Sequence, residues 1–149
     1  MTYKWKAGSR IKADPQKAVE QMQALEQAGN LSAKGLLDAN RPEDAPLHNE
    51  FEWNDGVAAE KYREHQAVHI INSIVMVREN AQPVRNFFKV SEGSRNYTSL
   101  SVIMDRQDTR EALLRQARRE LAAFELKYKV LEELAGVFNE IHKMEENND

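Results

Sequence analysis

The fold is decided by the C-terminal stretch DRQDTREALLRQARRELAAFELKYKVLEELAGVFNEIHKMEE, residues 105–146. Its apolar residues recur at steps that alternate between three and four: Leu114, Ala117, Leu121, Phe124, Tyr128, Leu131, Ala135 and Phe138. This spacing puts them in one stripe along a helix and is typical of a seam between two helices. The pattern therefore predicts one long helix from Asp105 to Glu146.

The predicted helix is too long for a compact chain of this size. About 40 residues in a helix extend roughly 60 Å, whereas the compact body of such a chain is about 40 Å across. We therefore expect the helix to project and to form a homo-oligomer through its seam: Leu114, Ala117, Leu121, Phe124, Tyr128, Leu131 and Phe138. The alternatives are a break, with Gly136 the expected place, or a helix that folds back on the N-terminal half of its own chain.

The composition favours a soluble, helix-rich protein. The chain has 149 residues, of which 41% are hydrophobic and 30% charged, which suits one domain with an appendage. It has no apolar run long enough to cross a membrane, and no apolar core follows the basic N-terminus. We expect a cytoplasmic protein without a membrane partner. The absence of cysteine excludes disulfides and thiolate chemistry.

Charge is unevenly distributed along the chain. The net charge of -3 counts against a strongly basic coat protein for nucleic acid, but it allows local basic patches. Acids dominate the segment from Glu43 to Glu64, in which only Lys61 and Arg63 are basic. Two basic clusters are candidates for contacting phosphates, one at the N-terminus and one in the middle of the chain: Lys4, Lys6, Arg10 and Lys12, and Arg85, Lys89 and Arg95.

The first basic cluster belongs to an extended arm. Tyr3, Trp5 and Ile11 alternate with lysines in residues 1–13. Aromatic residues between lysines allow an arm to lie along a phosphate backbone. The alternative, which is more common, is that the aromatic side chains dock on their own protein.

Three helices are predicted after the arm. Asp14 and Pro15 are typical of a helix start, and Gly29 is typical of a left-handed helix end. Ser32 is placed to cap a short helix through Ala39, and a third helix is expected from Asn54 or Asp55 to about Ser73. The dense aromatic residues before it, Phe51 and Trp53, are expected to fill the core.

After Ser73 the apolar period changes from helical to alternating. Three short antiparallel strands are predicted, at Ile74–Val77, Val84–Val90 and Tyr97–Met104. We thus expect an α+β fold, mainly α, with three parts: a basic arm (1–13), a helical body with a small sheet (14–104) and a long oligomerisation helix (105–149). Helices followed by a hairpin form the order of a winged-helix domain; a plain three-helix core is an equally good description.

One segment resembles a known protein family. Pro46-Leu47-His48, Phe51-Glu52-Trp53-Asn54-Asp55 and the following Ala58-Ala59-Glu60-Lys61-Tyr62-Arg63 resemble a motif of small, uncharacterised phage and prophage proteins. Lys61 and Val68-His69 depart from its usual form. The resemblance implies a bacterial or phage setting and brings no catalytic residue with it.

No constellation of residues indicates catalysis. His65 and His69 are one helical turn apart, a spacing that can hold zinc, but the pattern lacks the Glu base and a clear third ligand. We therefore expect helix-surface histidines, no metal, no cofactor and no catalytic residues. A metal-dependent hydrolase that uses these two histidines is the weakest alternative.

The sequence-based hypothesis for function is a non-enzymatic phage or prophage protein that binds DNA and self-associates through its C-terminal helix. The two basic clusters would contact phosphates. Any base recognition would come from the exposed residues of the third helix, which include Lys61, Arg63, Glu64 and Gln66. The alternative is an oligomeric protein-interaction or assembly module whose acidic Glu43–Glu64 segment excludes nucleic acid.

Overall fold

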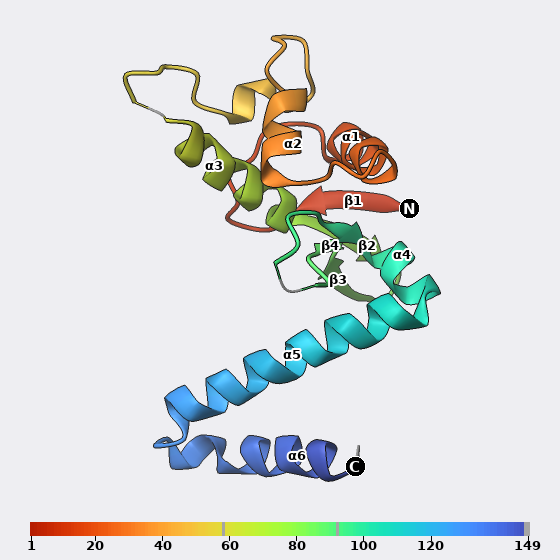
Figure 1. The fold of residues 1–149 in the computed structure, drawn as a ribbon, viewed down its shortest axis with the longest axis vertical. Coiled ribbons are helices and arrows are strands. Elements are labelled where there is room, and N and C mark those ends of the chain that lie inside the picture. Colours follow the sequence, from red (N-terminus) through yellow and green to blue (C-terminus); the bar gives the residue numbers. More distant parts are fainter. Residues whose placement is uncertain (58, 92, 148–149) are drawn as a thin grey trace.

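The protein consists of a helical body on a small sheet, with a helical hairpin projecting from it (Figure 1). The computed structural model describes residues 1–57, 59–91 and 93–147. The body holds helices α1 (Pro15–Gln27), α2 (Ala33–Ala39) and α3 (Glu60–Ser73), and the hairpin holds α5 (Gln107–Tyr128) and α6 (Ala135–Glu146). This confirms the predicted α+β fold, mainly α, with a small antiparallel sheet and a long C-terminal helix.

The predicted ends of the first two helices are confirmed. An Asp14 carboxylate oxygen accepts a hydrogen bond from the backbone N–H of Gln16 at 2.8 Å, and Pro15 is the first helical residue. After α1, Gly29 has a φ of 71°, and the N–H of Asn30 donates to the carbonyl of Leu25. This left-handed end needs glycine because a side chain at positive φ is strained. Ser32 Oγ caps α2 by accepting from the N–H of Gly35 at 2.9 Å.

The predicted start of the third helix is wrong. The chain first makes a short 3-10 turn, η1 (His48–Glu50), and α3 begins only at Glu60. Asn54 does not cap this helix, because its side-chain oxygen accepts from the N–H of Gly56 at 3.0 Å and closes a separate turn. The predicted end at Ser73 is confirmed.

The three-stranded sheet is present, but one of its strands comes from elsewhere in the chain. Strands β1 (Thr2–Trp5), β2 (Ile74–Arg78) and β3 (Ala81–Arg85) are antiparallel in the order β1-β2-β3. The N-terminal arm therefore supplies the strand that was predicted at Tyr97–Met104. The reason is burial, since Tyr3 is buried and the Trp5 indole N–H donates to the carbonyl of Ala13 at 2.6 Å. The arm thus docks its aromatic residues on its own protein.

The chain after β3 also differs from the prediction. The predicted strand Val84–Val90 is interrupted at Asn86, and its second half survives as β4 (Phe87–Phe88), which pairs with β5 (Thr98–Ser99). From Leu100 to Asp105 the chain forms helix α4 instead of a strand. Leu100 and Ile103 are three residues apart, so the apolar residues of this segment also fit the period of a helix. The helix buries Ile103, which favours it over a strand.

The prediction of one continuous helix to Glu146 is wrong. Helix α5 ends at Tyr128, the 3-10 turn η2 (Glu132–Leu134) reverses the chain, and α6 runs back beside α5 (Figure 1). The break therefore precedes Gly136, which lies in the first turn of α6. The hairpin also does not fold back on the N-terminal half. Its closure lets the chain bury Phe138 and Ile141, and the Phe124 and Phe138 rings meet at 6.2 Å between centroids.

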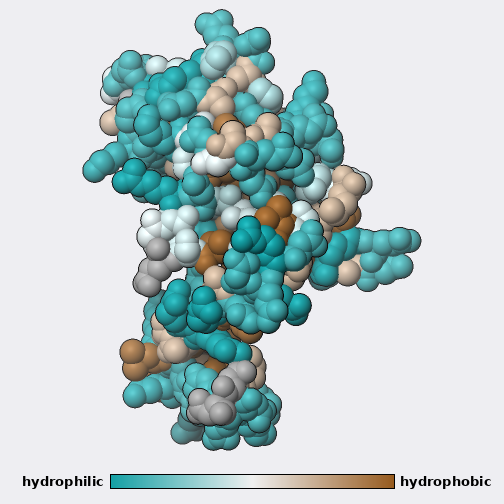
Figure 2. All heavy atoms as spheres, turned by 45° about the vertical axis from the view of Figure 1, so that its right-hand side comes forward, coloured by the Kyte–Doolittle hydropathy of each residue, from teal (hydrophilic) through white to brown (hydrophobic). Residues whose placement is uncertain are grey.

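The main core lies within the body, away from the hairpin. It gathers apolar side chains from β1, all three body helices and β2, with Phe51 buried and Trp53 packed against it, as predicted. The face shown in Figure 2 is mostly hydrophilic, with separate hydrophobic areas near its middle and on the projecting hairpin. Within the described ranges, no helix is both long enough and apolar enough to span a membrane.

Candidate functional site

A cleft lies between the body and helix α5, and we call it the basic cleft. Two adjoining hollows form it, of about 480 Å³ and about 620 Å³. They share Lys89, Gln116 and Glu120. Taken together, the two hollows are lined by Arg85, Phe88, Lys89, Ser91, Gly93, Ser94, Arg95, Tyr97, Leu113, Gln116, Ala117, Arg119, Glu120 and Ala123.

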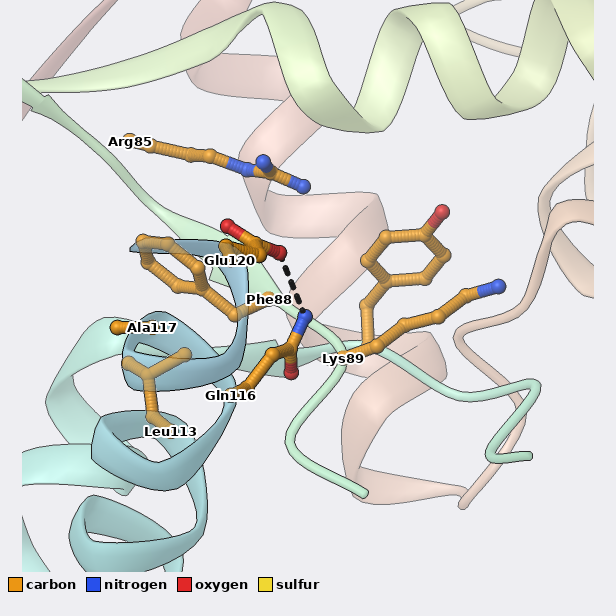
Figure 3. Close-up of a pocket in the computed structure, with 8 residues that line it drawn as sticks. Arg85, Phe88, Lys89, Leu113, Gln116, Ala117 and Glu120 are labelled. Atoms are coloured by element: carbon orange, nitrogen blue, oxygen red, sulfur yellow. Dashed lines mark hydrogen bonds between the residues drawn. The ribbon is translucent and has the colours of Figure 1, made fainter. Parts of the chain in front are cut away.

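Each wall of the cleft follows from a local sequence pattern. On the body side, Phe87 is fully buried, and because side chains alternate along a strand, the neighbouring Phe88 is turned to the cleft. On the α5 side, Leu113, Gln116, Ala117 and Glu120 are spaced by three and four residues, which places them on one helix face. Figure 3 shows these two sets of side chains facing each other.

Arg85 is held in place at the mouth of the cleft. Its Nε donates to the carbonyl of Phe87 at 2.9 Å, and its Nη2 donates to the side-chain oxygen of Asn72 in α3. The guanidinium lies over the Phe88 ring, 5.0 Å from the centroid. The planar cation is therefore fixed against an aromatic face without being neutralised.

Lys89 and Tyr97 form a second cation–aromatic pair in the cleft. Lys89 Nζ lies 5.2 Å from the centroid of the Tyr97 ring. Burial raises the pKa of the Tyr97 phenol above its ordinary value, and the nearby Arg85 charge opposes this shift only in part. Tyr97 is therefore neutral at pH 7 and keeps its proton as a hydrogen-bond donor.

The cleft is strongly cationic. Arg85, Lys89, Arg95 and Arg119 line it, against one acidic lining residue among those described, Glu120. None of the four cations forms an ion pair with a described residue. The structure thus brings together all three cations of the predicted central cluster and adds Arg119 from α5.

The basic N-terminal residues lie elsewhere, but their loop meets the same end of α3. The backbone N–H of Lys6 donates to the Ser73 carbonyl at 2.7 Å, and the His69 ring contacts the Ser9 carbonyl at 3.0 Å. Arg85 contacts Asn72 in the same turn of α3. The side chains of Lys4, Lys6, Arg10 and Lys12 are all exposed. The C-terminal end of α3 is thus contacted by the N-terminal loop at Lys6 and Ser9 and by one cation of the cleft, Arg85.

Two of the four α3 residues that were predicted to be exposed for base recognition have roles inside the protein. Arg63, which the sequence-based hypothesis placed on its exposed face, is buried. The Gln66 side chain accepts a hydrogen bond from the N–H of Glu52 at 3.1 Å and is also used inside the protein. The prediction that Arg63 is exposed is therefore wrong, whereas Lys61 is exposed as predicted, and base recognition by α3 stays a prediction. Both Arg63 and Gln66 hold the connector between α2 and α3.

Several acids of the Glu43–Glu64 segment have structural partners. One Glu50 carboxylate oxygen accepts from the backbone N–H groups of Lys12 and Ala13, at 2.9 and 2.8 Å. Asp55 pairs with Arg63, and Glu60 pairs with Arg41 at 2.8 Å. Hydrogen bonding to Arg41 holds the pKa of Glu60 below its ordinary value. Glu50 thus stabilises the arm beside Lys12, whereas Asp55 and Glu60 stabilise the N-terminal end of α3, the end opposite to its contacts with Lys6 and Arg85.

The seam residues are partly used inside the hairpin. Phe124 contacts Tyr128 and Phe138, and Leu131 lies in the turn between the helices. Leu114, Phe124 and Leu131 remain about two-fifths exposed. Leu121 is half-buried and Ala117 lines the basic cleft. The described residues include no group of three or more His, Asp and Glu placed to hold a metal.

Sequence reasoning missed the contribution of α5 to the cleft. Gln116, Arg119 and Glu120 were not among the predicted site residues. The available signal was the helical spacing of Leu113, Gln116, Ala117 and Glu120, which marks a second face of α5. What that face meets depends on the path of α4, which was predicted as a strand.

Comparison of the chain with models of known protein families, with curated proteins and with solved structures finds no match. The resemblance to phage and prophage proteins and the winged-helix interpretation therefore stay predictions.

Two residues of the segment that carries the resemblance, His48 and Trp53, contact each other. His48 stacks on Trp53 with 4.8 Å between ring centroids, and the Trp53 indole N–H donates to the His48 carbonyl.

Proposed function

We propose that this protein is a non-enzymatic DNA-binding protein of phage or prophage origin. It contacts the phosphate backbone with the basic cleft and with the basic residues of the N-terminal arm, and it self-associates through the C-terminal hairpin. These arm residues are Lys4, Lys6, Arg10 and Lys12. The observation that carries the proposal is the gathering of Arg85, Lys89, Arg95 and Arg119 around one cleft without an ion pair to any described residue.

Unpaired cations in a cleft favour a polyanionic ligand. An exposed cation that is not paired within the protein keeps its full charge for a ligand, and each phosphate that it neutralises releases counterions from DNA. Arg85 and Lys89 are also held over aromatic rings, so less side-chain freedom is lost when they contact a ligand. Phosphate contacts carry no sequence information, so these residues set affinity and not preference.

The net negative charge of the chain does not oppose this proposal. Asp55 and Glu60 pair at the N-terminal end of α3, and Glu50 accepts from the backbone N–H groups of Lys12 and Ala13, whereas Arg85 of the cleft contacts the C-terminal end of α3. At physiological salt, charges that are exposed and more than about 8 Å apart are largely screened from each other. A ligand at the cleft therefore responds mainly to the local cations.

Self-association would strengthen binding. The hairpin exposes several large apolar side chains, with Leu126 and Val130 being 72% and 81% exposed. Such patches commonly mark interaction surfaces. A dimer would present two basic clefts, and weak contacts of two linked sites add through effective concentration.

The same apolar surface supports a second candidate function, a protein-interaction or assembly module without a nucleic-acid role. In that case the hairpin would be the functional surface. The cleft would only reflect the angle between α5 and the body and would bind no ligand. The two candidates differ in whether changes in the cleft alter a measurable affinity for DNA.

Fluorescence anisotropy with labelled DNA at several salt concentrations tests the proposal. We expect modest affinity that falls steeply as salt rises. The double variant R95E/R119E should abolish binding at low salt. The matched control K17E/K129E changes the net charge equally at exposed lysines outside the cleft that form no ion pair with a described residue, and it should retain most of the affinity. Equal losses in both variants, or no binding by the wild type at low salt, would favour the assembly module.

A further inference from the structure

The basic cleft is a hollow, whereas duplex DNA is read by protein elements that protrude. A helix or a β-ribbon enters the major groove, which is about 12 Å wide, and the duplex is stiff over about 150 base pairs. The two hollows of about 480 Å³ and 620 Å³ are instead of the size that holds a small organic molecule. A rigid duplex would touch only the rim of the cleft, but a flexible single strand can enter it.

A flat stacking surface is already assembled at the mouth of the cleft. The Arg85 guanidinium lies over Phe88 and is fixed by Asn72 and the carbonyl of Phe87. Unpaired bases stack on aromatic rings and on arginine planes, and every base offers a face for this contact. In a duplex those faces are covered by the neighbouring base pairs.

Glu120 is the feature that phosphate binding alone does not explain. Its carboxylate faces into the cationic cleft, and one oxygen accepts a hydrogen bond from Gln116 Nε2 at 3.4 Å (Figure 3). A carboxylate repels phosphate, but it accepts hydrogen bonds from the amino groups of bases. Those groups are free on an unpaired base and are occupied in a base pair, so an acid beside a stacking surface suits a single strand.

We propose that the basic cleft binds unpaired nucleotides of a single-stranded nucleic acid, in preference to a duplex. This inference rests on the proposed function. A base stacks at Arg85 and Phe88, its edge is turned to Glu120 and Gln116, and the flanking phosphates contact Arg95 and Arg119. DNA and RNA strands share the chemistry that the cleft recognises.

The experiment compares four ligands of one sequence by fluorescence anisotropy: a 16-nucleotide DNA strand without self-complementarity, its RNA equivalent, and the DNA and RNA duplexes. At equal salt the wild type should bind one or both single strands at least ten-fold more tightly than either duplex. The tighter of the two single strands shows which sugar the cleft prefers. The variant F88L keeps an apolar side chain but removes the aromatic face, and it should weaken single-strand binding roughly ten-fold.

The salt dependence separates stacking from charge. F88L should leave the salt slope unchanged, whereas R119A should reduce it by about 0.7 for a single strand. Tyr62 is exposed on α3, so Y62L is the matched control and should leave binding unchanged. Duplex binding as tight as single-strand binding, or binding that F88L does not alter, would overturn this inference and leave the proposed function in place. Absence of binding to all four ligands at low salt would overturn both.

Discussion

The Arg63 guanidinium lies over the indole ring of Trp53, with 5.4 Å between Cζ and the ring centroid. On the same ring, the His48 imidazole stacks with an interplanar angle of 9°. Arg63 Nε also donates to the Glu52 carbonyl at 2.9 Å, and its terminal nitrogens pair with Asp55 and Glu60. One buried cation therefore ties α3 to the connector that precedes it.

The first prediction concerns this buried cation. R63A removes the charge-assisted hydrogen bond to the Glu52 carbonyl and the contact with Trp53, so it should lower the free energy of unfolding by about 2–3 kcal/mol. R63K should recover only part of the loss, because an ammonium cannot reproduce the planar fork. Urea unfolding measures the effect.

R110A is the control for Arg63, because Arg110 is exposed and forms no ion pair with a described residue. It should change stability by less than about 0.5 kcal/mol. Equal effects of R63A and R110A would show that the buried cation does not stabilise the connector.

The second prediction compares two helical glycines, Gly35 in α2 and Gly136 in α6. A Cβ on Gly35 would lie 2.0 Å from the Asn30 carbonyl oxygen, whereas a Cβ on Gly136 would meet nothing within 4 Å. G35A must displace backbone and should prevent normal folding or lower the melting temperature sharply. G136A should stabilise the protein by about 0.5–1 kcal/mol, because alanine favours the helix over glycine. Thermal unfolding followed by circular dichroism measures both melting temperatures. If G35A and G136A shifted the melting temperature in the same direction, this account would be contradicted.

The elements that the sequence predicted well depend on local chemistry. The Asp14-Pro15 start, the Gly29 end and the Ser32 cap are each set by hydrogen bonds within a few residues, and all three are present. The hairpin of β2 and β3 is likewise local. The pairing of the N-terminal strand is not local, because Tyr3 pairs with Met76 and all three body helices lie between these residues in the sequence.

The candidate site was predictable only in part for the same reason. The sequence identified Arg85, Lys89 and Arg95 as a cationic group, and all three line the cleft. The opposite wall depends on the angle at which α5 leaves the body, which α4 sets through the burial of Ile103. The seam pattern could not reveal the turn after Tyr128, because its spacing continues through Leu131 and Ala135 as though the helix were unbroken.

The third prediction concerns acid stability. Hydrogen bonds from Arg41 hold the pKa values of Asp38 and Glu60 below their ordinary values of 3.8 and 4.5. A carboxyl whose pKa is lower in the folded state stabilises the fold above its unfolded pKa, and this contribution is lost as the pH falls through the folded pKa. R41Q should therefore lower the melting temperature slightly at neutral pH and reduce its further fall between about pH 5 and about pH 3.

R110Q is the control for Arg41 because it removes an equal charge without breaking a pair with a described residue. Its melting temperature should fall with acid as steeply as that of the wild type. If R41Q also follows the wild-type curve, the Arg41 pairs are too well solvated to contribute.

The fourth prediction concerns the hairpin surface. Leu126 and Val130 are 72% and 81% exposed near the end of α5, so L126E/V130E should leave the monomer folded, with an unchanged circular dichroism spectrum. In a self-associated protein these charges would be desolvated without partners, at a cost of several kcal/mol. Light scattering should then show a smaller species than the wild type. V57E adds a charge at a site that is 69% exposed in the body and should keep the wild-type size. A wild type that stays monomeric at high concentration would rule out self-association and with it the gain in DNA affinity expected from two linked clefts.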